Sequence, residues 1–375
     1  MTLPEARRER LRTLGIRRLI AGSTLLRSVG LVVAAAIVLW IVSTYLSAYN
    51  DTQLATGAYY FAALAGLTVL AGRSGQISLG HGALMAVGAY TVALLIGSEG
   101  WPLVPALVAS AGVTALVGLP VGAAASRLRG PYLAGATLAF AVGLPALADK
   151  FPATFGGENG LVIIPPIPPS WLGADFPLER WEAWIACAGA LVVVFVLYNL
   201  VNSGFGRAMR AVRDDEISAS LSGMRVGRTQ TVAFVVSAGC AGLGGGLLCV
   251  VLQLATPGAF PLQLSLSLLT GVVIGGLGSL IGAVWGAALL VLLPGWSNDI
   301  ANAFSLSTNV SSNLPLAIYG VVLIAAILAW PTGIQGGIRA LWQLLPSRTA
   351  GDVGLPTGGP VDQPGSRPDV DEGAG

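Results

Sequence analysis

The chain has 375 residues, of which 54% are hydrophobic and only 10% are charged. This composition lies outside the range of soluble globular domains and predicts an all-α polytopic membrane protein, because helices satisfy their own backbone polar groups in lipid. The net charge of +2 offers no strongly basic surface, so we expect no nucleic-acid partner.

Residues 1–28 form a basic segment with seven arginines, and an apolar run over residues 29–49 follows directly. That run is too long for the hydrophobic region of a signal peptide and no small-residue cleavage site closes it, so we expect a retained first span and a cytoplasmic N-terminus. Each span needs roughly 20 apolar residues. About ten spans are predicted, the others over residues 53–71, 75–96, 102–125, 132–148, 184–200, 231–252, 264–277, 280–293 and 314–330.

The run over 264–277 is short, so a re-entrant pair with the run that follows it is an alternative. Glycines spaced four residues apart predict close helix packing in three runs: Gly118 with Gly122, Gly242 with Gly246, and Gly278 with Gly282 and Gly286. Three cysteines, Cys187, Cys240 and Cys249, lie in apolar runs without the spacing of a disulfide framework or a metal site. We expect them to pack in the interior.

Residues 151–183 interrupt the apolar pattern with many prolines, tryptophans and acids, and we expect no helical run before residue 182. This composition predicts an extracytoplasmic segment with aromatic residues at the membrane interface. The acids of this segment could steer a docking protein, and they are Glu158, Asp175, Glu179 and Glu182. A simple lid is the alternative role for the segment.

The distribution of charge predicts which loops share a side. With the N-terminus inside, arginine-bearing loops fall on the cytoplasmic side, at Arg73, Arg127, Arg129, Arg339 and Arg348. Acidic residues fall on the other side, at Asp51, Glu99, Asp149, Glu158, Asp175 and Asp299. This agreement favours an even number of spans within one transmembrane domain over residues 29–348. The tail over 349–375, rich in glycine, proline and aspartate, is expected to be disordered and cytoplasmic.

Residues 204–230 form the one densely charged interruption of the apolar pattern. Arginines flank an acidic triplet, and apolar residues recur at near-helical spacing. The pattern predicts two short amphipathic helices, the second capped by Asp214 or Asp215 and ended by Gly223. The apolar stripe must pack either on its own span ends or on a docking partner. An equally simple interpretation is that the arginines only set orientation.

Several kinds of chemistry are missing from the residues. No acidic residue lies within a predicted span, which disfavours a self-sufficient ion-coupled transporter. The only lysine, Lys150, is not in a phosphate-binding loop, so the chain itself is not expected to hydrolyse ATP. The sequence shows no catalytic motif, cofactor-binding motif or metal-binding motif, so none of these sites is expected. Energy for uphill transport would have to come from another subunit.

His81 lies in GQISLGHGALMAVGAY, near the start of the third predicted span. A lone histidine there is more often a satisfied structural donor than a ligand. Glycine and polar residues surround it: Gly75, Gln76, Ser78, Gly80 and Gly82. They predict a loosely wound helix start whose free N–H groups could face a cavity and bind a carboxylate. A glycine-lined packing face is the alternative.

Four motifs occur in order: SGQISLGHGALMAVGAYTVALL, RLRGPYLAGATLAFA, FGGENGL and FGRAMRAVRDDEISASLSGM. Together they resemble the inner-membrane permease subunits of ATP-binding-cassette importers for branched-chain amino acids. The form with RLRGPYLA and a long basic N-terminus is similar to the M-type permease. The resemblance covers residues 53–330 and is specific at the level of the family. Importers of urea, amides and other amino acids are also similar, so it does not specify the substrate.

The resemblance implies a non-enzymatic subunit that pairs with a homologous H-type permease, two cytoplasmic ATPases and an extracytoplasmic binding protein, in contact with membrane lipid. The charged stretch would then be the coupling helix that docks in a groove of the ATPase, with Asp214 as its cap, Met224 as an added apolar contact and Gly206 matching the motif. Ile217 and Ser218 stand where other importers have alanine. The coupling residues implied are Arg207, Arg210, Arg213, Asp214, Asp215, Glu216, Ile217, Leu221 and Gly223.

The same resemblance implies a substrate pathway along residues 75–90 and 132–140. The residues expected to line it are Gln76, Ser78, Gly80, His81, Gly82, Tyr90, Tyr132 and Thr137. An ATP-independent channel or a membrane scaffold is the alternative from another functional class.

Overall fold

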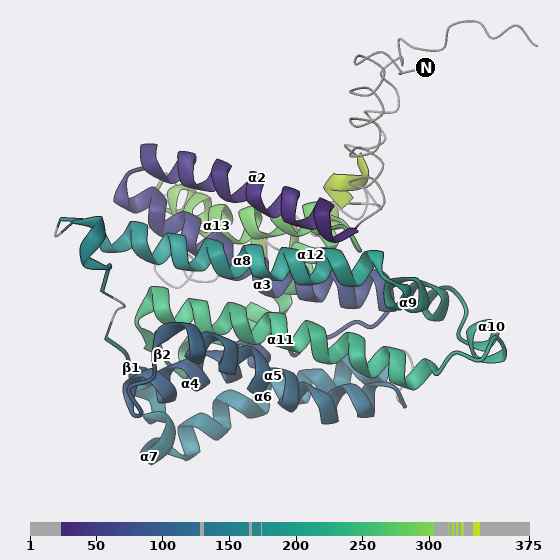
Figure 1. Ribbon diagram of the computed structural model, residues 1–375. Helices are drawn as coiled ribbons and strands as arrows, with labels where there is room; N and C mark the ends of the chain where they lie inside the picture. The colour runs from purple at the N-terminus through teal and green to yellow at the C-terminus, as the bar shows by residue number, and fades with distance from the viewer. Residues whose placement is uncertain are drawn as a thin grey trace, which may run out of the picture.

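The computed structural model describes residues 24–127, 131–164, 167–173, 175–303 and scattered residues between 314 and 337. The described part is a bundle of long helices, which confirms the all-α polytopic class (Figure 1). The long helices are α2 (Thr24–Tyr45), α3 (Ala48–Ser74), α4 (His81–Gly97), α5 (Leu103–Ala125), α6 (Pro131–Lys150), α8 (Leu178–Asn202), α11 (Val226–Leu252), α12 (Leu262–Gly275) and α13 (Leu280–Ala303).

Among the described residues, seven helices are long and apolar enough to cross a membrane, and α4 and α13 add two shorter apolar helices. These correspond to the first nine predicted spans. Most of the tenth predicted span, the chain before residue 24 and the predicted tail over 349–375 lie outside the described residues.

Short elements connect the long helices at both ends of the bundle. They are α7 (Pro152–Phe155), η1 (Gly157–Asn159), β1 (Leu161–Val162), η2 (Ser170–Leu172), α9 (Gly204–Asp214), α10 (Glu216–Leu221), β2 (Leu254–Ala255) and η3 (Pro257–Ala259). The two strands pair antiparallel, with Leu161 opposite Ala255 and Val162 opposite Leu254. Residues 151–181 therefore contain helical turns and the start of α8, and the prediction of no helical run there was wrong.

Helices α3 and α8 begin earlier than predicted because a partly buried ion pair holds charged residues in their first turns. Arg180 Nε lies 3.3 Å from Asp51 Oδ2, and Asp51 is fully buried. Ser43 Oγ also donates to Asp51 Oδ1 at 3.3 Å, and Trp184 Nε1 donates to Ser43 Oγ at 3.0 Å. The ion pair satisfies both charges. Because Asp51 lies within the first turn of α3, the expectation that no acid lies within a span was wrong.

Helix α11 is the centre of the bundle and packs against α3, α4, α5 and α8 (Figure 1). Its glycines allow this close packing. A Cβ on Gly244 would lie 2.8 Å from the carbonyl oxygen of Tyr59 in α3, and one on Gly245 would overlap the carbonyl of Met85 in α4. A Cβ on Gly242 would overlap Thr114 of α5. The predicted packing role of Gly242 is confirmed, since only glycine lets these backbones approach.

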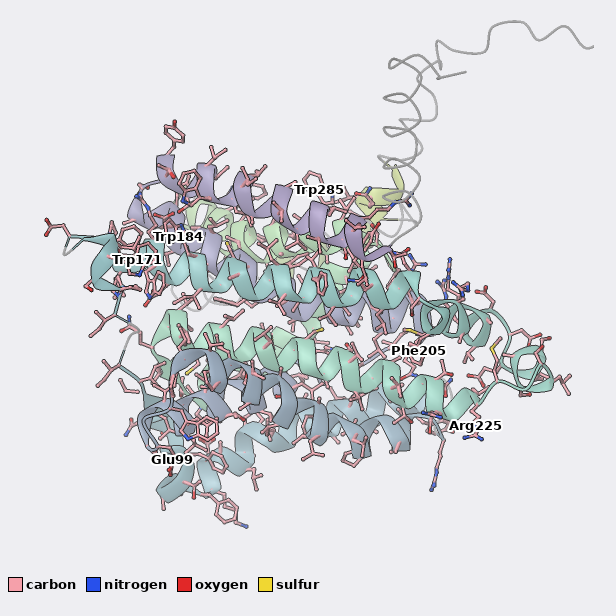
Figure 2. The ribbon with its side chains drawn as sticks, in the orientation of Figure 1. Glu99, Trp171, Trp184, Phe205, Arg225 and Trp285 are labelled. Carbon is pink, nitrogen blue, oxygen red and sulfur yellow. The ribbon has the colours of Figure 1, made fainter. Side chains whose placement is uncertain are left out.

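The two ends of the bundle differ in character, and we name them by their elements. The arginine end carries α9 and α10, and the strand end carries α7, β1 and β2, at opposite ends of the long helices (Figure 1). Figure 2 shows Phe205 and Arg225 at the arginine end, and Glu99 and Trp171 at the strand end. The predicted separation of arginine loops from acidic loops is therefore confirmed for the described residues. Which compartment each end faces stays a prediction.

Helix α12 crosses the bundle. It follows β2 and η3 at the strand end, and the turn after it reaches the arginine end, where Arg73 Nε donates to the carbonyl oxygen of Gly278 at 3.2 Å. The two short runs thus form separate helices joined at the arginine end. The re-entrant alternative is not what the described residues adopt.

Candidate functional site

Helix α9 begins at a serine cap and packs on the bundle through an apolar face. The backbone N–H groups of Phe205 and Gly206 donate to Ser203 Oγ at 3.2 and 3.4 Å. Met209 and Val212 are buried, and the helix contacts α3, α8 and α11. The apolar half of the charged stretch that lies in α9 therefore packs on the chain's own spans.

A sharp corner separates α9 from α10. Asp215 has an extended backbone, with φ of −156°, and its carboxylate accepts hydrogen bonds from Ile217 N at 2.9 Å and Ser218 N at 3.2 Å. Ser218 Oγ also donates to it at 2.6 Å, and these bonds, led by the hydroxyl, hold the pKa of Asp215 below its usual value. The cap is thus Asp215. Assigning it to Asp214 was wrong, because Asp214 ends α9.

Helix α10 leaves its large apolar residues uncovered. Ile217 is 71% exposed and Leu221 is 84% exposed, whereas the small Ala219 faces inward. Gln230 Nε2 of α11 donates to Glu216 Oε1 at 2.8 Å and holds the helix to the bundle. Gly223, with φ of 82°, ends the helix as predicted. The tip of the arginine end is therefore the short, capped helix α10 (Figure 1). This helix exposes Ile217 and Leu221.

The arginines of this end divide into two groups. Arg207, Arg210, Arg225 and Arg228 are exposed at the surface. Arg213 is also exposed, but its Nη1 donates to the carbonyl oxygen of Gly72 in α3. Met224 is half-buried. The predicted coupling residues thus lie in two consecutive short helices, α9 and α10, and in the turn after them.

Helix α4 starts after a non-helical segment, residues 76–80. Helix α3 ends at Gly75, whose φ of 73° turns the chain into this segment. His81 Nδ1 lies 3.0 Å from Ser78 Oγ, and His81 Nε2 lies 2.8 Å from Ser237 Oγ of α11. Both ring nitrogens are therefore paired, in agreement with the reading of His81 as a satisfied structural group.

Three hydroxyl groups, two of them from other helices, satisfy N–H groups just before α4 and in its first turn. Thr137 Oγ1 of α6 accepts from Leu79 N at 2.9 Å, and Ser265 Oγ of α12 accepts from Gly82 N at 3.0 Å. Ser78 Oγ accepts from Gly80 N at 3.3 Å. The expectation of free N–H groups facing a cavity was wrong for these positions, because side chains occupy them. We call Ser78, His81, Thr137, Ser237 and Ser265 the His81 cluster.

The other predicted pathway residues lie apart from this cluster or at its edge. Gln76 is buried and donates to Ser74 Oγ at 3.1 Å, while its Oε1 atom has no partner among the described residues. Tyr90 is buried with its ring 5.3 Å from that of Phe155, and its hydroxyl is likewise without a partner there. Tyr132 is 73% exposed, so it lies on the outer surface of α6.

Two members of the His81 cluster were not predicted from the sequence. Ser237 and Ser265 are single hydroxyl residues within apolar helices, where serine commonly bonds to its own helix backbone. The only signal in the sequence was a polar residue within an apolar run. Their partners lie 156 and 183 residues away along the chain, so no local pattern could reveal the pairing.

Comparison with known proteins identifies the family. Residues 49–328 match the family described as branched-chain amino acid transport system, permease component. The chain belongs to this family. Within it, the chain is 33% identical to the high-affinity branched-chain amino acid transport system permease protein LivM of Escherichia coli, over 73% of this chain and 69% of the relative. The LivM protein of Salmonella typhimurium is 31% identical over the same shares.

A second type of permease matches less closely. The permease protein LivH of Escherichia coli is 26% identical, over 77% of this chain and 94% of the relative. The greater identity to LivM confirms the resemblance to the M-type permease. No solved structure matches the chain.

The strand end of this permease carries a second exposed surface. Val162, Ile164, Ile167 and Trp171 are exposed apolar residues on or beside β1 and η2. Glu158, Asp175 and Glu179 are exposed acids in the same segment. Glu182 is different, because it is buried and accepts from Gln253 Nε2 at 3.0 Å. Its predicted part in an acidic docking surface was wrong.

Proposed function

We propose that this permease is the membrane-spanning subunit of an importer for branched-chain amino acids, driven by separate ATPase subunits that dock at the arginine end. Family membership and the named relatives support the substrate class. An importer of urea, amides or another small polar solute is the second candidate, since the related permeases share the same motifs. The arginine end and both termini would lie in the cytoplasm, because arginine bias marks that side.

The uncovered face of α10 is the observation that carries the docking role. Ile217 and Leu221 are four residues apart, so they lie on one side of the helix. Truncating a central apolar residue at an interface commonly lowers affinity by about 1–3 kcal/mol. The Asp215 cap and the Glu216–Gln230 bond hold this face in one orientation, which favours rigid docking over a flexible orientation signal.

The docking proposal is tested by co-purification from native membranes. We expect ATPase subunits to co-purify with the tagged wild-type chain, and Ile217→Asp or Leu221→Asp to release them while the permease stays folded. Ser222→Asp is the matched control, since it adds the same charge at an exposed position outside the Ile217–Leu221 face. Equal retention of ATPases by all three variants would contradict docking on α10.

The substrate proposal is tested by uptake. We expect liposomes that hold the purified importer and its binding protein to accumulate radiolabelled leucine. This uptake should require ATP on the side of the liposome membrane that the arginine end faces. Urea and acetamide serve as competing probes. Leucine entry through the chain alone, without ATPases, would instead favour the channel alternative.

The strand end is the surface that we assign to the binding protein. It lies at the end of the bundle away from α10, and it exposes both acids and apolar residues such as Ile167 and Trp171. Protein–protein contacts commonly combine apolar residues with polar ones. A homologous H-type permease would complete the membrane part of the assembly, with the exposed faces of the outer helices in contact with it or with lipid.

A further inference from the structure

Arg213 lies in the last turn of α9, immediately before the corner into α10. Its guanidinium donates to the carbonyl oxygen of Gly72, in the last turn of α3. Carbonyls of a last helical turn have no partner within their own helix, so a side chain from another helix satisfies this one. The positive charge is also favourable near the C-terminal end of the α3 dipole.

The stem of Arg213 covers the residue that ends α3. A Cβ built on Gly75 would lie 3.2 Å from Arg213 Cγ. Gly75 has the left-handed conformation from which residues 76–80 depart. Arg213 therefore contacts the α3–α4 junction at two points, through a hydrogen bond to Gly72 and through packing on Gly75.

Residues 76–80 connect that junction to the His81 cluster within a few residues. Leu79 donates to Thr137 of α6, and Ser78 contacts His81, which in turn contacts Ser237 of α11. On the other side, α10 is joined to α9 by the capped corner at Asp215. A continuous series of contacts thus runs from the exposed tip of the arginine end to the start of α4.

We propose that Arg213 is a positioning residue that transmits movement of α10 to the start of α4. The inference rests on the proposed docking of ATPases on α10. Coupling between distant sites needs a connected set of contacts that both sites can bias. Arg207 and Arg210 lie on the same helix, but in the described part of the chain they form no hydrogen bond from their side chains to another element. Arg213 is the arginine of α9 that makes this connection.

Substitutions of Arg213 separate its hydrogen bond from its bulk. Arg213→Met keeps an apolar stem over Gly75 and removes the donor, and Arg213→Gln keeps an N–H group on a shorter side chain. Arg213→Lys keeps a positively charged donor of similar reach. Arg127→Met is the matched control, because Arg127 is an exposed arginine at the same end, after α5. All four are assayed in liposomes with the complete importer and leucine.

The first measurement is leucine uptake per ATP hydrolysed. We expect Arg213→Met and Arg213→Gln to keep the ATPases bound but to lower this ratio about tenfold, within the range typical of coupling between sites. Arg213→Lys should restore most of it, and Arg127→Met should match the wild type. A purely structural role would lower assembly and leave this ratio unchanged.

The second measurement follows the junction directly. A spin label on Ile77→Cys is selective, since Ile77 is exposed and the three native cysteines are buried. We expect the label to become more mobile in Arg213→Met even without ATPases, and to lose its response to ATP in the importer. Arg213→Gln repeats the test if Arg213→Met does not fold.

Two outcomes would overturn the inference and are distinguishable. Bound ATPases with a wild-type uptake ratio and a wild-type label response in Arg213→Met would overturn the role of Arg213 alone. Absence of any ATPase on the wild-type chain would overturn the proposed docking, and the transmission role with it.

Discussion

His81 joins three parts of the chain through one buried side chain. It is 1% exposed, and its two ring nitrogens contact hydroxyls of Ser78 and Ser237. In either neutral tautomer one nitrogen donates and the other accepts, and each serine can supply the complementary role. The residue therefore fixes the start of α4 against α11, where no hydrophobic driving force exists between helices in lipid.

Substitution at His81 separates a structural role from a pathway role. We expect His81→Asn to keep assembly and leucine uptake, since an amide can bond to at least one of the two hydroxyls. His81→Leu should lower thermal stability in detergent, because an unsatisfied buried polar group costs about 1–3 kcal/mol. Equal loss of uptake in both variants with normal assembly would instead assign His81 to the pathway.

At the scale of the element, α10 depends on its cap. A six-residue helix cannot form by propensity alone, so the bonds from Ile217 N and Ser218 N to Asp215 and the packing of Ala219 hold it. Since these bonds lower the pKa of Asp215, the cap contributes fully above the ordinary carboxyl pKa. Its contribution is lost as the pH falls through the lowered value.

Removal of the cap should expose α10 to exchange. We expect Asp215→Ala to speed hydrogen exchange at the amides of residues 217 and 218 and to weaken ATPase retention, whereas Asp214→Ala should leave these two amides protected. Hydrogen-exchange mass spectrometry of the purified permease measures the difference. Unchanged protection in Asp215→Ala would show that packing alone holds the helix.

The strand-end segment offers a test of electrostatic docking. We expect Glu158→Gln, Asp175→Asn and Glu179→Gln together to reduce stimulation of ATP hydrolysis by the binding protein severalfold at low salt, mainly through a slower encounter. The effect should shrink as salt is raised, because screening removes long-range attraction. Stimulation at the wild-type level in low salt would exclude a role for these acids.

Glu182→Gln is the control with a different expected result. Its carboxylate accepts a hydrogen bond from Gln253, the residue after α11, and Glu182 is buried, so it offers no charge to a docking protein. We expect it to leave the salt dependence of stimulation unchanged. A salt-dependent loss equal to that of the triple variant would contradict this assignment.

At the scale of the whole molecule, the bundle is organised around α11, with the two chemically different ends separated by its length (Figure 1). Loops rich in arginine gather at one end, whereas Glu99, Asp175 and Glu179 lie at the other, so the rule that arginine-rich loops face the cytoplasm predicts the orientation of the chain. The same geometry places α10 and the proposed binding-protein surface at opposite ends of the bundle. We therefore expect them to lie on opposite sides of the membrane.

Cysteine labelling tests this orientation. We expect Asp175→Cys to react with an impermeant maleimide in intact cells, and Ser220→Cys to react only after permeabilisation. Both positions are exposed, and the native cysteines are buried and should stay silent. Reaction of Ser220→Cys from outside intact cells would reverse the topology.

Much of this architecture follows from the sequence because its causes are local. Apolar runs of membrane length predicted nine helices that the structure describes, and charge predicted which loops share an end. An aspartate at 214 or 215 predicted the start of α10, and Gly223 predicted its end. What only the tertiary structure decided depends on contacts between distant residues. The apolar spacing is alike in α9 and α10, yet Met209 and Val212 are covered by other helices and Ile217 and Leu221 are not.

Contacts between distant residues also explain the other differences between the predictions and the structure. The sequence places Asp51 and Arg180 in loops. In the structure they lie 129 positions apart in the chain and form an ion pair, and both are inside helices. Ser237 and Ser265 look like isolated hydroxyls until the fold brings them to His81 and Gly82. Local sequence determines where helices form and which side their charges favour, whereas burial and the pairing of polar groups are decided by which helices meet, since those free energies arise only on packing.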